Sequence, residues 1–149
     1  MITLQRTHPA NTDFIHLVKQ LDTFLAILDG EDHAFYNAFN NTGFLKYAVV
    51  AYIDDKPVAC GAIKEFNATA MEVKRMFTLP EWRGKGLATQ ILAELELWTK
   101  ELGYTTCVLE TGIRQPEAIA LYEKCGYRRV PNYGQYAGVE ASVCFEKKL

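Results

Sequence analysis

Residues 72–89 read EVKRMFTLPEWRGKGLAT, and the fold of the chain can be worked out from this stretch. Its first half is apolar enough for a strand inside a sheet, and Pro80 ends the strand because proline has no N–H to donate. A loop with the sequence Arg-Gly-Lys-Gly at 83–86 then leads into an apolar helical pattern that begins at Leu87. Such a loop leaves backbone N–H groups unpaired at the positive end of a helix dipole, an arrangement that binds phosphate.

Two common phosphate loops do not fit this stretch. A P-loop requires Ser or Thr directly after its lysine, but Gly86 follows Lys85. The dinucleotide pattern G-x-G-x-x-G has Thr89 at its third glycine, and Glu110 comes too late to be its acidic ribose ligand. Two alternatives remain, an Arg-x-x-Gly-x-Ala pattern at 83–88 with a function of its own and an ordinary glycine turn between a strand and a helix.

The composition is that of a globular protein of one domain. The chain has 149 residues, of which 49% are hydrophobic and 23% charged, and its formal net charge is -2. This balance gives no general electrostatic reason to bind nucleic acid. Basic residues do gather locally at Lys74, Arg75, Arg83 and Lys85, which favours a single polyanionic ligand.

The spacing of the cysteines tests for a metal site, and the apolar segments test for secretion or insertion into a membrane. The four cysteines (Cys60, Cys107, Cys125 and Cys144) are widely spaced without a C-x-x-C pair, so we expect no metal site and a reducing compartment. The first residues lack the profile of a signal peptide, and no apolar run is long enough to span a bilayer. The sequence therefore predicts a cytoplasmic protein without a membrane partner.

Periodicity and turn residues predict the order of the elements. We expect one strand, two helices, three strands, and then a helix, a strand, a helix and two strands. The strands are expected at 2–7, 46–53, 58–66, 72–79, 105–111, from 127 and around 143–145, and the helices at 12–28, 32–39, 86–102 and 116–125. The crossover between 73 and 111 requires a parallel pair in an otherwise antiparallel sheet, so residues 1–149 are predicted to form one α/β domain.

Residues 115–127, QPEAIALYEKCGY, form a second motif. Together with Arg-x-x-Gly-x-Ala it resembles the two signatures of the GNAT N-acetyltransferase superfamily, the second of which reads Asn-x-x-Ala-x-x-x-Tyr-x-x-x-Gly-Phe. Gln115 replaces the usual Asn and Tyr127 the usual Phe, while the separation of the motifs and the element order match over nearly the full chain. The resemblance implies a single GNAT-like domain with a mostly antiparallel sheet of six to seven strands, a splayed parallel pair at its centre and helices on both faces.

The resemblance also implies acetyl-CoA as the co-substrate and a place for each part of it. The pantetheine arm would enter between the splayed strands and pair with the backbone of Met76 and Thr78, while the N–H groups of 84–89 would hold the pyrophosphate. Arg83 would add a charge, and the Gln115 amide would contact the arm. The expected acetyl-CoA-binding residues are Met76, Phe77, Thr78, Arg83, Gly84, Lys85, Gly86, Leu87, Ala88, Thr89, Gln115 and Tyr122.

Acetyl transfer to an amine needs a base for the ammonium group and an acid for the leaving thiolate. The resemblance makes Tyr122 the general acid, since a phenol with a pKa of about 10 keeps its proton at neutral pH. Glu110, at the end of the strand beside the crossover, is the expected base, and Glu72 is the second candidate. The alternative roles are a tyrosine that packs on the sheet and carboxylates that are solvated at strand ends.

The acceptor of the acetyl group is predicted as a class of molecule, with alternatives. We expect direct transfer, without an acyl-enzyme, to a primary amine of a small molecule; the alternatives are a protein or peptide N-acetyltransferase and a non-catalytic acyl-CoA-binding sensor. The family places the acceptor near the first two helices and the loop before the last strand, which here hold Asp29, Glu31, Asp32, His33, Tyr36, Tyr133, Gln135 and Tyr136. The acidic residues suit a polyamine-like acceptor, whereas Arg114 suits an amino-acid-like one. By analogy with family dimers, residues 142–149 are a candidate surface for a homodimer.

Overall fold

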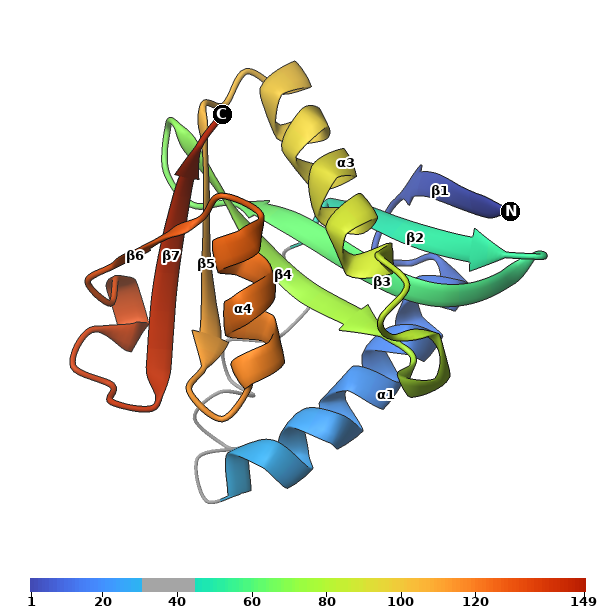
Figure 1. Cartoon of the computed structure of the whole chain (residues 1–149). Helices are drawn as coiled ribbons and strands as arrows, with labels where there is room; N and C mark the ends of the chain where they lie inside the picture. The colour runs from blue at the N-terminus through green and yellow to red at the C-terminus, as the bar shows by residue number, and fades with distance from the viewer. Residues whose placement is uncertain (31–44) are drawn as a thin grey trace.

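The computed structural model describes residues 1–30 and 45–149, which contain a seven-stranded sheet in the order β1-β2-β3-β4-β5-β7-β6 (Figure 1). The strands are β1 (Ile2–Thr7), β2 (Tyr47–Ile53), β3 (Lys56–Glu65), β4 (Ala70–Thr78), β5 (Thr106–Gly112), β6 (Arg128–Val130) and β7 (Ser142–Lys148). All neighbouring strands are antiparallel except β4 and β5, which are parallel. The predicted α/β fold with a mixed, mostly antiparallel sheet is confirmed.

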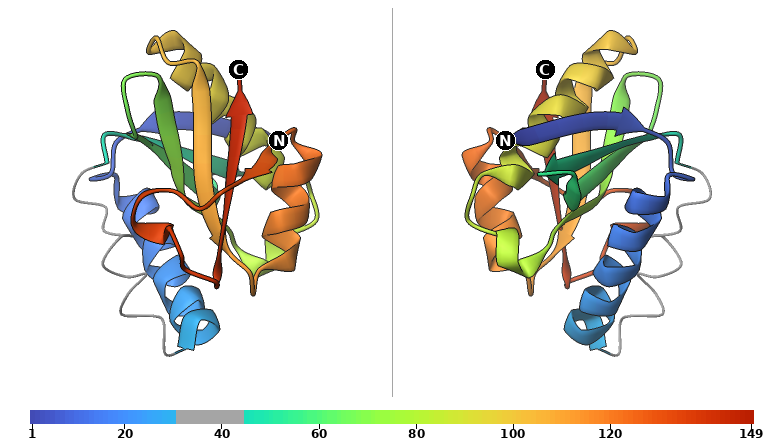
Figure 2. Two further views of the ribbon diagram at one scale, coloured as in Figure 1. Left: turned by 90° about the vertical axis from the view of Figure 1, so that its left-hand side faces the viewer. Right: turned by 90° about the vertical axis from the view of Figure 1, so that its right-hand side faces the viewer.

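Helices cover both faces of the sheet. They are α1 (Thr12–Asp29), α3 (Leu87–Glu101) and α4 (Pro116–Lys124), with short 3-10 turns at Pro80–Trp82 and Gly134–Tyr136. Figure 2 shows α1 on one face and α4 with α3 on the other, and we call these the α1 face and the α3 face. The helix expected at 32–39 lies outside the described residues.

The helices follow from local sequence signals. The Asn11 side chain accepts a hydrogen bond of 3.0 Å from the Phe14 backbone N–H and so caps α1, which ends at Gly30 with a φ of 55°. Helical spacing then buries Phe14, Leu17 and Leu21 against the α1 face of the sheet. In α3 the same spacing buries residues 87, 91, 92 and 95 on the opposite face. The two apolar faces of the sheet are therefore covered by two separate cores.

The hairpin between β2 and β3 is tighter than the sequence suggested. Asp54 and Asp55 form the turn with positive φ angles of 49° and 65°, as two-residue hairpin turns require. Lys56 and Pro57, which we expected in the turn, already pair with β2.

A β-bulge interrupts the pairing of β3 with β4. Cys60 pairs with Phe77 and Ala62 with Lys74, so Gly61 alone faces two residues, Arg75 and Met76. Arg75 has a φ of 59°, which is unusual for a residue with a side chain. The extra residue breaks the alternation of β4, so the consecutive Lys74 and Arg75 both point to the α1 face while Met76 packs on the α3 face.

The parallel pair opens after three residues. Register pairs join β4 to β5 only from Ala70 with Thr106 to Glu72 with Val108, and beyond them the two strands diverge (Figure 1). On its other side β5 stays paired with β7 along its whole length. The second half of β4 therefore presents backbone groups to the gap between the two strands.

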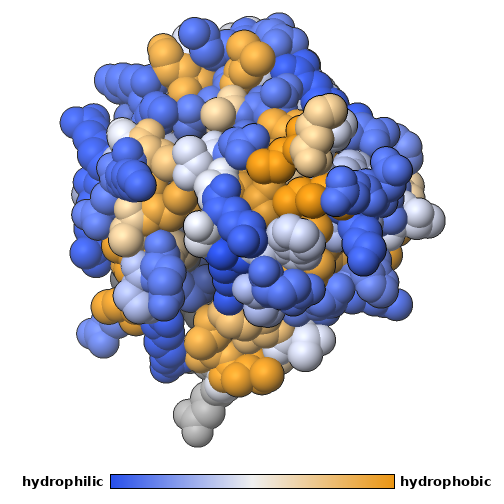
Figure 3. Space-filling view, turned by 45° about the vertical axis from the view of Figure 1, so that its right-hand side comes forward, coloured by the Kyte–Doolittle hydropathy of each residue, from blue (hydrophilic) through white to orange (hydrophobic). Residues whose placement is uncertain are grey.

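The outer surface shown in Figure 3 has hydrophobic side chains in separate groups among hydrophilic ones. Large exposed apolar side chains such as Ile15, Ile27 and Leu97 belong to different helices or different parts of one helix. Within the described residues, no helix combines the length and the hydropathy that crossing a membrane requires.

The bulge predicts a strict requirement for glycine at position 61. A Cβ there would lie 2.6 Å from Met76 Sδ, 2.8 Å from Ile91 Cγ2 and 2.9 Å from Leu95 Cδ1. We expect Gly61→Ala to lower the free energy of unfolding by about 1–3 kcal/mol through overpacking between β3 and α3, measured by urea denaturation. Gly112→Ala is the matched control, because its Cβ would meet nothing nearer than Gln115 Nε2 at 3.4 Å. Equal stabilities of the two variants would contradict this account of the bulge.

Candidate active site

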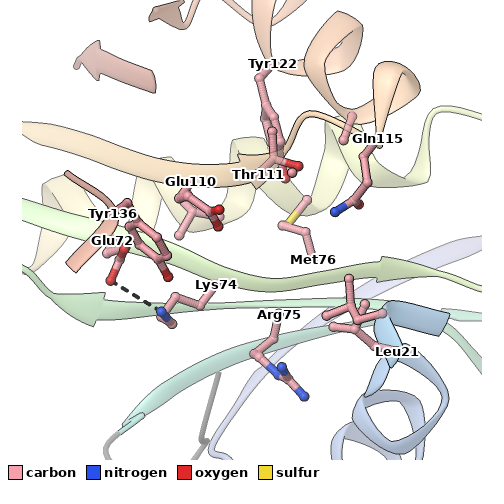
Figure 4. A pocket seen from close by; sticks show the side chains of 14 residues that line it. Leu21, Glu72, Lys74, Arg75, Met76, Glu110, Thr111, Gln115, Tyr122 and Tyr136 are labelled. Atoms are coloured by element: carbon pink, nitrogen blue, oxygen red, sulfur yellow. Dashed lines mark ion pairs between the residues drawn. The ribbon is translucent and has the colours of Figure 1, made fainter. Parts of the chain in front are cut away.

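A pocket opens where β4 and β5 diverge, and it is lined from both faces of the sheet (Figure 4). Its described lining consists of Leu21 and Leu25 of α1, residues 72–76 of β4, residues 110–112 of β5, Gln115, Ala118 and Tyr122 near or in α4, and Tyr136. The gap between the strands therefore connects the α3 face, where α4 lies, with the α1 face.

On the α3 face, Tyr122 and Gln115 point towards Met76 across the gap (Figure 4). Tyr122 is 6% exposed, and its ring packs at centroid distances of 5.9 Å from Tyr127 and 6.1 Å from Phe145. Burial raises the pKa of Tyr122, and the nearby Cys125 and Glu110 add to the effect. The phenol therefore holds its proton throughout the neutral pH range.

At the end of β5, Glu110 points into the same pocket (Figure 4). Its neighbour Leu109 is buried in the core of the α3 face, so alternation along the strand turns Glu110 the other way. The Glu110 Oε2 atom is shielded from solvent, and the charge of Glu110 contributes, after burial, to the raised pKa of Tyr136. A phenol on α4 and a carboxylate on β5 thus meet at one opening, although 12 positions separate them in the chain.

The second carboxylate, Glu72, is held by two neighbours. The Tyr133 hydroxyl donates a hydrogen bond of 2.7 Å to Glu72 Oε2, and Lys74 Nζ lies 3.5 Å from Glu72 Oε1. Burial and the charge of Glu72 together raise the pKa of Tyr133, so its hydroxyl remains a donor at neutral pH. Both oxygens of Glu72 are therefore engaged within the protein.

Arg75 forms an ion pair with Asp22 of α1, at 2.5 Å between Nη2 and Oδ1. The Arg75 side chain is 2% exposed whereas that of Asp22 is 44% exposed. No sequence signal predicted this pair, because the two residues lie 53 positions apart and meet only when the bulge turns Arg75 towards α1.

The glycine loop between β4 and α3 is exposed at residues 83–86. Gly84 and Gly86 have φ angles of 77° and 79°, and no side chain caps the N-terminus of α3. The first N–H groups of α3, from Leu87 onwards, consequently lack the side-chain acceptor that Asn11 supplies in α1. This arrangement suits an anion at the positive end of the helix dipole.

Arg83 is the first residue of the loop, and its side chain makes contacts within the protein. Its Nε donates a hydrogen bond of 3.0 Å to the Thr78 carbonyl, and its guanidinium lies 5.1 Å from the Phe24 ring centroid and 5.8 Å from that of Phe77. Arg83 thereby ties the end of β4 to α1. Of the four basic residues expected to gather around one polyanion, Lys74 and Arg75 line the pocket, whereas Arg83 and Lys85 lie in the exposed loop.

Some of the site residues predicted from the sequence line this pocket, and others lie elsewhere. The pocket brings together Glu72, Met76, Glu110, Gln115, Tyr122 and Tyr136. Phe77 instead packs in the core of the α1 face, and Arg114 is exposed, with Nη1 donating to the Leu28 carbonyl at 3.2 Å. The residues at 31–36 expected near the acceptor, and the side chain of Asp29, lie outside the described part.

The cysteines are set apart from this chemistry. Cys60, Cys107 and Cys144 are buried, and burial raises the pKa of the Cys60 thiol to about 12. Cys125 follows α4 directly, is partly exposed, and is not among the described residues that line the pocket. This arrangement does not favour a reactive thiolate at the opening.

Comparison with known proteins adds an independent line of evidence. A family model described as the acetyltransferase (GNAT) domain matches residues 45–129. An IAA acetyltransferase of Azospirillum brasilense is 31% identical over 99% of this chain and 98% of its own length.

Solved structures are similar over the full chain. A Klebsiella pneumoniae protein provisionally assigned as an acyl-CoA N-acyltransferase superposes with a TM-score of 0.84 at 31% identity, covering 100% of this chain and 98% of its own. A GNAT family acetyltransferase from Elizabethkingia anophelis, solved with acetyl-CoA bound, has a TM-score of 0.70 at 15% identity and covers 99% of this chain and 98% of its own. The second likeness is one of fold alone.

Proposed function

Because this chain belongs to the GNAT acetyltransferase family, we propose that it transfers an acetyl group from acetyl-CoA directly to the primary amine of a small molecule. The observation that carries the proposal is the opening between β4 and β5, where Tyr122 and Glu110 line one pocket. One side chain can supply a proton and the other can accept one, as acetyl transfer from a thioester to an ammonium group requires.

Acetyl-CoA is the co-substrate, and the residues present fit its parts. The loop at 84–89 offers unpaired N–H groups to the pyrophosphate, and the backbone of Met76 and Thr78 borders the gap in which a pantetheine arm would pair as an added strand. The Gln115 amide lines the same gap. Acetyl-CoA supplies an activated acyl group, and the chain supplies its orientation.

We propose that Tyr122 is the general acid of the reaction. Burial keeps its phenol protonated, and the ring contacts with Tyr127 and Phe145 fix its direction. The phenol would deliver its proton to the sulfur as the carbon–sulfur bond breaks. A backbone N–H in the unpaired half of β4 would stabilise the charge that develops on the carbonyl oxygen.

We propose Glu110 as the base that takes a proton from the acceptor ammonium, directly or through water. Glu110 is preferred because its charge lies close enough to act on the Tyr122 phenol. Glu72, which Tyr133 and Lys74 hold, is the second candidate. The partly exposed Cys125 is not needed in this scheme, so transfer without an acyl-enzyme is the simpler course.

The extent and setting of the protein are also proposals. A single N-acetyltransferase domain over 1–149 is supported by the Azospirillum brasilense relative, which aligns over 98% of its own length. A cytoplasmic location and a homodimer through residues 142–149 stay predictions. For the dimer, β7 lies between β5 and β6, so contact through this segment would involve the faces or ends of β7.

The first experiment is to measure CoA thiol release from acetyl-CoA with a panel of small amines, amino acids, polyamines and N-terminal peptides. We expect turnover with at least one small primary amine and a product whose mass is increased by one acetyl group. Turnover with peptides alone would favour the protein or peptide N-acetyltransferase. Tight acetyl-CoA binding without any turnover would favour the non-catalytic sensor and contradict the proposal.

The role of Tyr122 predicts the effect of Tyr122→Phe. The variant loses one hydroxyl and keeps the ring packing, so we expect kcat to fall about 100-fold while the acetyl-CoA Kd stays nearly unchanged. Steady-state kinetics and calorimetry measure the two quantities. Tyr104→Phe is the control, because the Tyr104 hydroxyl contacts Glu65, which is not among the described lining residues. A kcat equal to that of the unmodified protein would remove Tyr122 from the mechanism.

The proposed phosphate loop predicts that Gly86→Asp strongly weakens acetyl-CoA binding. A Cβ at Gly86 would meet nothing within 4 Å, and aspartate tolerates a positive φ better than most residues, so the variant should fold. Its carboxylate would repel the pyrophosphate, and we expect at least a 100-fold rise in the acetyl-CoA Kd by calorimetry. Gly138→Asp is the matched control, with a φ of 77° and equally open space. Normal affinity in Gly86→Asp would overturn the loop assignment.

A further inference from the structure

Arg75 carries two buried donors that the folded chain leaves unused. Among the described residues, its Nη2 bonds Asp22, whereas Nε and Nη1 are buried without a hydrogen-bond partner. Leaving a buried charged donor unsatisfied is costly, and most such groups in folded proteins have partners. Arg75 also holds a positive φ to reach this position. Both costs are expected where a side chain is kept for a ligand.

The position of Arg75 indicates which ligand that is. Arg75 lines the pocket from β4, with Leu21 and Leu25 of α1 beside it and Glu110 on β5 opposite. In Figure 4 Arg75 extends below β4 towards α1, on the side away from Met76 and Tyr122. The side with Met76, Tyr122 and Gln115 is the one proposed for the acetyl-CoA arm, so the side with Arg75 is left for the acceptor.

The charges of the pocket favour an acceptor that is itself a zwitterion. The charged side chains in the described lining are Glu72, Glu110, Lys74 and Arg75, which sum to zero. Glu72 and Lys74 pair with each other, whereas among the described residues Arg75 pairs with Asp22 through Nη2 alone and keeps two buried donors that an anionic group of a ligand could accept from. A polyamine carries no anionic group and would leave these two buried donors without an acceptor, which is unfavourable.

We propose that Arg75 binds a carboxylate of the acceptor, so that the preferred substrate is an amino carboxylate with an apolar body. The carboxylate would bond the guanidinium, the apolar part would pack on Leu21 and Leu25, and the amine would face Glu110. This inference rests on the proposed function and names its substrate class. It chooses the amino-acid-like acceptor and assigns its recognition to Arg75 in place of Arg114.

The test compares acceptors in matched pairs, each an apolar amino acid and the amine left when its carboxylate is removed. With the unmodified protein we expect kcat/KM to be at least tenfold higher for the amino acid in at least one pair. Better turnover of the amines, or turnover of polyamines alone, would overturn the inference and leave the acetyltransferase proposal standing. Absence of turnover with every pair, in protein that binds acetyl-CoA, would also overturn it.

Arg75→Gln locates the carboxylate contact. We expect kcat/KM for the amino acid to fall about 10- to 100-fold, mainly through KM, while that for the matching amine changes little. The variant should fold, because the Asp22 carboxylate left behind is 44% exposed and can be solvated. Circular dichroism and the acetyl-CoA Kd check this independently of turnover.

Two further variants separate the rival explanations. Arg129→Gln makes the same change at an exposed position on β6, outside the described lining, and should leave both acceptors unaffected. Arg114→Gln tests the alternative site at the end of α1. Loss of the amino-acid preference in Arg114→Gln, with the preference intact in Arg75→Gln, would overturn the assignment to Arg75.

Discussion

The bulge at Arg75 and Met76 opposite Gly61 is the constraint on which the centre of this molecule depends. It inserts one extra residue into β4 opposite Gly61 of β3, so the end of β4 points in a different direction relative to β5. Pairing between β4 and β5 then stops after Glu72 and Val108. Gly61 permits this because Met76, Ile91 and Leu95 occupy the space that a Cβ would need. The pocket exists because two central strands are prevented from pairing.

The same irregularity distributes charge between the two faces. Without an extra residue, Lys74 and Arg75 would point in opposite directions, and one of them would enter the apolar core beneath α3. With it, both lie on the α1 face, where Glu72 and Asp22 offset their charges. The α3 face keeps Met76 beside Tyr122, an apolar setting that raises the pKa of the phenol. The single change of register at the bulge therefore divides the pocket into a polar half and a less polar half.

We propose that the acetyl-CoA arm binds in the less polar half and the acceptor in the polar half, which matches this asymmetry. A thioester arm bordered by strand backbone needs few charged side chains, whereas an acceptor that enters as a charged amine needs groups that can pair with it and take its proton. Glu110 reaches the polar half because alternation along β5 turns it away from Leu109. In the segment before β7, Tyr136 lines the polar half of the pocket and Tyr133 holds Glu72 through a hydrogen bond.

Much of the fold was predictable because its signals are local. The cap at Asn11, the turn at Asp54 and Asp55, the stop at Pro80 and the glycine entrance to α3 each act within a few residues, and the periodicity of α1 and α3 fixed their buried sides. The parallel pair followed from the crossover. The hairpin turn was placed two residues too long, since Lys56 and Pro57 join the strand through pairing with β2 that the local sequence does not specify.

For the site, the two motifs identified the glycine loop, Gln115 and Tyr122, and the strand end identified Glu110. The tertiary structure decided which side chains hold Glu72, which basic residues share a pocket, and that Arg75 meets Asp22. These outcomes depend on register and on contacts between residues up to 61 positions apart, such as Tyr133 with Glu72. The sequence by itself determined the elements and the chemistry at the ends of strands and helices, because propensity and capping are local. Only folding decided the orientation of β4, because a bulge is selected by the packing of α3 and α1 on the two faces of the sheet.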